Sequence, residues 1–175
     1  MNIILSIIIA GVLIYLIVKF CLLIYRPFFL SKTFRNIDEM YNRVLNHTER
    51  SIHSALEDLK EWEAGDKVIR LVHSEDRITK NVNDAESAKA HEEEVYAKFL
   101  RLKEHFIHHP TKLAEAIAAY QRYLKVRLAQ FQGASIYSSG VTSGAITFDE
   151  LVKYRNEIII ILKENERKLD MLLTD

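Results

Sequence analysis

The sequence predicts an all-α protein, in which one N-terminal transmembrane helix is followed by a cytoplasmic helical bundle or coiled-coil-like domain. A nearly unbroken apolar segment opens the chain at residues 3–25. Over most of the remaining length, apolar residues recur at steps of three and four, the period of an amphipathic helix. The 175 residues include only 5 Gly and 2 Pro, so few positions can end a helix.

The apolar segment has the length of a membrane-spanning helix. Residues 3–25 would measure about 34 Å as a helix, which crosses a hydrocarbon core of roughly 30 Å with some tilt. A secretion signal would carry a charged start and a small-residue cleavage site, and neither is found around this segment. We therefore expect residues 1–30 to form a retained anchor and its junction with the membrane surface.

The distribution of basic residues predicts the orientation of this anchor. No Lys or Arg precedes the segment, whereas several follow it. The positive-inside rule then places the N-terminus outside and the C-terminal domain in the cytoplasm. Pro27 is expected to bend or stop the helix at the membrane surface. The residues expected to contact lipid at this interface are Lys19, Tyr25, Arg26, Phe28 and Phe29.

Residues 31–132 are predicted to form a helical bundle or stalk. The first helix carries a heptad-like seam, and it is either a free coiled-coil stalk or a member of the bundle. Gly65 either ends this helix or lies inside a longer one. The expected helices span about 33–64, 66–82, 84–109 and 110–132. The seam consists of Phe34, Ile37, Tyr41, Val44, Thr48, Ile52, Ala55, Leu59 and Trp62.

A Gly/Ser-rich stretch, residues 133–146, is expected to be a flexible loop. Gly133 has the character of a residue that follows a helix end. Thr147 and Glu150 form a T-x-x-E capping box, which predicts that the last helix spans residues 147–175. Together, the helix-end glycine, the Gly/Ser-rich stretch and the capping box predict that the C-terminal part of the chain consists of a loop and one helix.

The last helix contains five consecutive apolar residues, 158–162. Burial within the bundle is one explanation of this belt. Because one helix seam needs fewer apolar residues, we expect its outer side, Ile160 and Ile161, to bind another protein or a second copy of the chain.

The sequence offers few candidate metal-binding or catalytic residues. His105, His108 and His109 lie at i, i+3 and i+4 near an expected helix end, and they are the candidate metal ligands. The alternative is a helix C-terminus that favours histidine through its dipole. Glu92 and its two acidic neighbours are expected on a solvated face. No catalytic residue and no cofactor are predicted.

Three function classes remain. The leading class is a non-enzymatic adaptor or accessory subunit that holds a partner at the cytoplasmic membrane face. A second class is a membrane-anchored inhibitor or immunity-type protein that neutralises a toxin or enzyme. The third is a metal-dependent membrane-anchored enzyme built on the histidines. The formal net charge of zero argues against nucleic acid as a partner.

Overall fold

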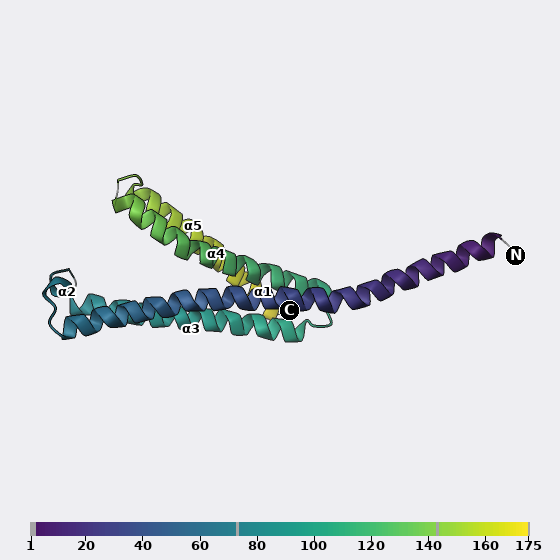
Figure 1. Ribbon diagram of the computed structural model, residues 1–175, viewed down its shortest axis with the longest axis horizontal. Helices are drawn as coiled ribbons and strands as arrows, with labels where there is room; N and C mark the ends of the chain where they lie inside the picture. Colours follow the sequence, from purple (N-terminus) through teal and green to yellow (C-terminus); the bar gives the residue numbers. More distant parts are fainter. Residues whose placement is uncertain (1–2, 73, 143, 175) are drawn as a thin grey trace. The chain divides into compact units, whose positions relative to one another are not determined.

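The computed structural model describes the backbone of residues 3–72, 74–142 and 144–174. Side chains are described over the same ranges, except at residues 3–10, 18, 21–28, 68, 71–72 and 134–142. The described residues form five α-helices and no strand, which confirms the all-helical fold class (Figure 1). The chain divides into two compact units, Met1–Glu39 and Met40–Asp175.

Helix α1, Ile3–Glu63, begins in the first unit and ends in the second. It continues through Pro27, so the expected helix stop at this residue is wrong. A proline withdraws one backbone donor from the helix, and the hydrogen bonds on both sides of it keep this long helix continuous. The helix ends at Glu63, two residues before Gly65, whose φ of +86° favours glycine, and the Asp66 N–H donates to the Glu61 carbonyl at 3.0 Å.

The first unit exposes apolar side chains on every side of its helix. Residues 12–17 are each between 53% and 63% exposed. Arg35 and Glu39 approach to 3.9 Å one helical turn apart. Within the described ranges, no helix combines the length and the apolar character that crossing a membrane requires, so the expected transmembrane helix has no support from the structure.

The second unit contains the remainder of α1 with α2 (Lys67–Val72), α3 (Glu75–His105), α4 (Pro110–Thr142) and α5 (Phe148–Thr174). In this unit the seam of α1 is buried at four of its predicted positions. Thr48, the polar member, donates its hydroxyl to the Leu45 carbonyl at 2.8 Å, so it can be buried. The four buried positions are Tyr41, Val44, Thr48 and Ala55.

Residues 40–63 of α1 belong to the bundle and are not a free stalk. The Tyr41 ring stacks on Tyr96 of α3, with ring centroids 3.9 Å apart. On the surface, the Lys89 ammonium lies 3.0 Å from the Glu49 carboxylate. Aromatic stacking therefore joins α1 to α3 in the core, and an ion pair joins them at the rim.

The boundary between α2 and α3 differs from the prediction. The described helix begins at Glu75 after Ser74, whereas a break before Asp84 was expected. Asp84 lies inside the helix, where its carboxylate is 2.7 Å from the Lys80 ammonium one turn earlier. An i, i+4 ion pair stabilises a helix interior, so Asp84 does not mark the start of a helix.

Helix α4 continues to Thr142, so the expected loop at residues 133–146 is helical over most of its length. Gly133 does not end the helix. It allows a close approach instead, because a Cβ atom there would lie 1.9 Å from the Tyr154 hydroxyl oxygen of α5. That hydroxyl donates to the Ala129 carbonyl at 3.1 Å. Glycine is needed here for helix packing, which overrides its low helix propensity.

The capping box at the start of α5 is confirmed. The Thr147 N–H donates to Glu150 Oε2 at 2.8 Å, and the Glu150 N–H donates to Thr147 Oγ1 at 3.2 Å. The Thr147 N–H and the Thr147 hydroxyl both donate to Glu150 Oε2, and these two bonds, first the one from the backbone, lower the pKa of the Glu150 carboxyl. From this start α5 runs back along α4, and the two helices lie side by side with extensive contact (Figure 1).

Candidate functional site

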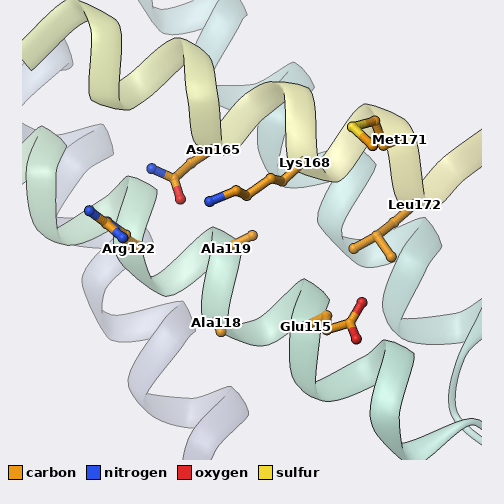
Figure 2. A pocket seen from close by; sticks show the side chains of 8 residues that line it. All are labelled: Glu115, Ala118, Ala119, Arg122, Asn165, Lys168, Met171 and Leu172. Carbon is orange, nitrogen blue, oxygen red and sulfur yellow. The ribbon is translucent and has the colours of Figure 1, made fainter.

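A groove of about 480 Å³ lies between α4 and α5 (Figure 2). It is named the α4–α5 groove here. On each helix its residues recur about one turn apart, so they share one face. The lining residues are Glu115, Ala118, Ala119 and Arg122 of α4, with Asn165, Lys168, Met171 and Leu172 of α5.

The floor of the groove is apolar and its rim is charged. Ala119 and Leu172 are buried, whereas Glu115, Arg122 and Lys168 are exposed. The Lys168 ammonium lies 3.0 Å from a Glu164 oxygen. The pKa of the Glu164 carboxyl is lowered chiefly by this hydrogen bond, and the nearby charge of Arg122 adds to the effect.

The lining thus contains one acidic side chain, Glu115, and two basic ones, Arg122 and Lys168, of which Lys168 is paired with Glu164 outside the lining. An apolar floor within a rim of mixed charge fits an amphipathic helix better than a strongly charged ligand.

Asn165 is the polar residue of the groove floor and is only 1% exposed. Its Nδ2 donates to the Ile161 carbonyl at 2.7 Å. Its Oδ1 has no hydrogen-bond partner among the described residues, and Figure 2 shows the amide turned toward the groove. A buried carbonyl oxygen without a donor is unfavourable by about 1–3 kcal/mol. The groove thus contains an acceptor that a bound donor would satisfy.

The apolar belt of α5 is divided between the core and the surface. Ile158 and Leu162 are each 8% exposed and belong to the core, but Ile160 is 65% exposed. Ile161 is partly exposed and lies four residues before Asn165, so it continues the groove face along α5. Ile160 and Ile161 are named the isoleucine pair: Ile161 continues the groove face, and Ile160 lies next to it on the exposed side of α5. Burial in the bundle explains only part of the belt.

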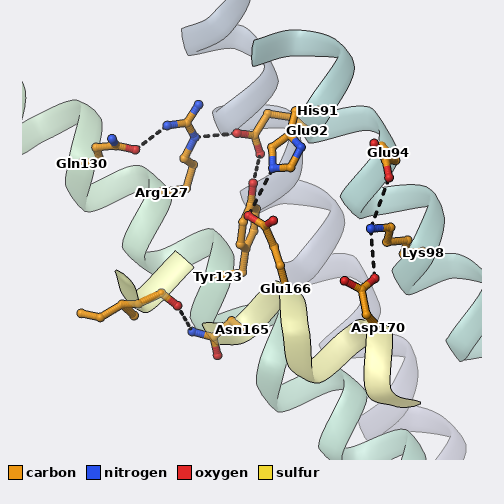
Figure 3. A network of polar contacts seen from close by, with 11 residues as sticks. His91, Glu92, Glu94, Lys98, Tyr123, Arg127, Gln130, Asn165, Glu166 and Asp170 are labelled. Atoms are coloured by element: carbon orange, nitrogen blue, oxygen red, sulfur yellow. Dashed lines mark hydrogen bonds and ion pairs between the residues drawn. The ribbon is translucent and has the colours of Figure 1, made fainter. Parts of the chain in front are cut away.

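A buried polar network lies behind this surface and joins α3 to α4 (Figure 3). Glu92 is 1% exposed, so the prediction that it lies on a solvated face is wrong. Its carboxylate accepts a hydrogen bond from the Tyr123 hydroxyl at 2.9 Å and another from Arg127 Nε. Arg127 also donates to Gln130. A spacing signal was present, because Ala88, Glu92 and Val95 follow the steps of the core stripe.

The polar network and two further contacts hold α3, α4 and α5 in position against one another. Burial, followed by the nearby Glu92 carboxylate, raises the pKa of Tyr123 and keeps its hydroxyl protonated as a donor. Beside it, His91 Nε2 of α3 lies 3.2 Å from Glu166 Oε1 of α5. Lys98 and Asp170 form a second bridge between the same helices at 3.0 Å. Together these contacts fix α4 and α5, which form the groove, against α3.

The candidate metal ligands do not share a helix face. Helix α3 ends at His105, so the predicted i, i+3 and i+4 relation to His108 and His109 is not formed. The rings of His105 and His109 instead lie at 4.8 and 6.2 Å from the Phe106 ring, measured between centroids. In the part of the chain that the structure describes, no group of three His, Cys, Asp or Glu side chains could hold a metal ion.

The predicted membrane-interface residues are described only in part. The Lys19 ammonium lies 5.6 Å from the centroid of the Tyr15 ring, one helical turn earlier, and Phe29 is exposed. The side chains of Tyr25, Arg26 and Phe28 lie outside the described residues.

Comparisons with protein-family models, curated proteins and solved structures found no match to this chain. Function is therefore inferred from the α4–α5 groove, the isoleucine pair and the N-terminal apolar segment.

Proposed function

We propose that this chain is a non-enzymatic, single-pass membrane-anchored helical interaction protein. It acts as an adaptor or accessory subunit that holds a partner at the cytoplasmic face. The exposed isoleucine at position 160 carries this proposal, because Ile158 and Leu162 already fill the core beneath it. An exposed apolar side chain beside an apolar groove, surrounded by charged residues, is typical of a protein interface.

The anchor is proposed from the N-terminal apolar segment. Six consecutive residues, 12–17, cover the full circumference of a helix and are all more than half exposed. A helix that is apolar all round is favoured in hydrocarbon and disfavoured in water, which supports a membrane location. The basic residues that follow the segment support an orientation with the C-terminal domain in the cytoplasm.

The orientation can be tested with reporters fused to the C-terminus. We expect a reporter that works only in the cytoplasm to be active, and one that works only outside to be inactive. Adding three or four lysines before Ile3, while neutralising Arg26, Lys32 and Arg35, is expected to weaken or invert this pattern. Activity of the outside reporter on the unmodified chain would contradict the proposed topology.

The proposed function itself can be tested by affinity purification of the full chain in mild detergent, followed by mass spectrometry. We expect a stoichiometric partner that belongs to a larger assembly. A toxin or an enzyme neutralised in a one-to-one complex would replace the adaptor proposal with the inhibitor function. Recovery of the tagged chain with no stoichiometric partner protein would contradict both.

A further inference from the structure

We propose that the α4–α5 groove binds the same groove of a second copy of this chain. The two copies are antiparallel, with a two-fold axis midway between Ala118 and Ala119. The inference rests on the proposed function in treating this face of the bundle as an interface, and it specifies one occupant of that face.

The middle of the groove allows two helices to approach closely. Ala118 and Ala119 occupy the centre of its α4 side, between the longer side chains of Glu115 and Arg122. Packed helix axes lie about 8–10 Å apart, and small side chains favour the shorter distances. An α4 helix of the partner subunit would cross α4 most closely at these alanines.

The charges of α4 are complementary to those of an antiparallel copy. Glu115 and Arg122 lie two helical turns apart on one face, and the alanines lie at their midpoint. A two-fold axis through this midpoint brings Glu115 opposite Arg122 of the partner subunit, and the symmetry makes the contact twice. A two-fold interface requires a surface that is complementary to itself. This surface meets that requirement.

Asn165 gives an independent reason to expect an occupant. Its Oδ1 is buried, faces the groove and has no hydrogen-bond donor among the described residues. A donor from the partner subunit would satisfy this oxygen. A single buried asparagine in a helix interface commonly determines the register and the number of helices. The same residue would therefore favour one arrangement of the two copies.

Charge reversal in the full chain, kept in mild detergent, tests the pairing. Glu115→Arg alone or Arg122→Glu alone places like charges opposite each other twice, and we expect each to raise the dimer dissociation constant roughly tenfold. The double variant exchanges the two charges and is expected to restore dimerisation. Arg155→Glu, at an exposed α5 position outside the groove, is the matched control. Sedimentation measures the dimer fraction, and circular dichroism checks folding.

Cysteine cross-linking tests the antiparallel direction. In a Cys21→Ser background, Ala118→Cys is expected to form a disulfide-linked dimer under mild oxidation, because the two positions meet at the axis. Lys125→Cys lies on the same face but about 20 Å from its symmetry mate along the axis, so it is expected to remain unlinked. A parallel pair would link both positions.

The outcomes are distinct. Dimerisation that is lost in the single variants and restored in the double variant, with linkage at position 118 only, supports the proposal. A monomer, unaffected single variants, or equal linkage at position 125 overturns it. A further outcome is a different protein that co-purifies with the unmodified chain, is lost from the Glu115→Arg variant and does not return with the double variant. That result also overturns the dimer proposal, but it leaves the proposed function standing. If the dimer forms and affinity purification yields no other protein, the proposed function fails instead.

Discussion

Arg127→Met is expected to destabilise the bundle by about 3–5 kcal/mol, because it leaves a buried carboxylate without its cation. Glu92 is 1% exposed, and its other described hydrogen bond comes from the neutral Tyr123 hydroxyl. The free energy of unfolding can be measured by denaturant titration of the full chain in mild detergent, followed by circular dichroism.

Two further variants separate this explanation from a general effect of losing an arginine. Arg155→Met removes an exposed arginine of α5 that lies outside the α4–α5 groove, and we expect a change below about 1 kcal/mol. Glu92→Leu combined with Arg127→Met removes the buried charge together with its partner and is expected to recover most of the lost stability. Equal stability of Arg127→Met and the unmodified chain would show that the network does not stabilise the fold.

The pair Ile160→Glu with Ile161→Lys is expected to abolish partner binding while the chain remains folded. Ile160 is 65% exposed and Ile161 is partly exposed, so both new charges can reach water. In the complex, the same charges would be buried against apolar side chains of the partner with no opposite charge nearby, which is unfavourable. Affinity purification of the variant measures binding, and a circular dichroism melt measures folding.

The matched control makes the same exchange at the two core positions of the belt. Ile158→Glu with Leu162→Lys places charges at side chains that are each 8% exposed, and we expect this pair to unfold the bundle. If the variant at positions 160 and 161 also unfolds, these residues belong to the core and the surface proposal is wrong. If it stays folded and keeps its partner, the interface lies elsewhere.

Sequence reasoning succeeded where neighbouring residues decide the structure. The capping box of Thr147 and Glu150 is made of hydrogen bonds between residues three positions apart, so the sequence alone predicts it. The seam of α1 could also be predicted, because apolar residues that recur with the helical period lie on one face of the helix, and that face packs against the neighbouring helices. Even Thr48 fits this rule, since its hydroxyl is satisfied within its own helix.

The same reasoning failed where a distant residue decides the structure. Gly133 resembles a helix end in isolation, but it lies inside α4 because Tyr154 of α5 occupies the space of a side chain. Glu92 was assigned to a solvated run of acids, although Arg127 and Tyr123, more than thirty positions away, hold it in the core. The histidine cluster was expected on a helix that ends at His105.

The helical class, the seam and the start of α5 follow from the chain's own periodicity and short-range hydrogen bonds, which act within one or two turns. The groove, the exposure of Ile160 and the position of the Asn165 oxygen, which has no donor among the described residues, depend on which face of α5 meets α4. Periodicity identifies an apolar belt without selecting the side that its neighbours will cover. That selection comes from contacts that form when the two helices pack, such as Gly133 of α4 with Tyr154 of α5.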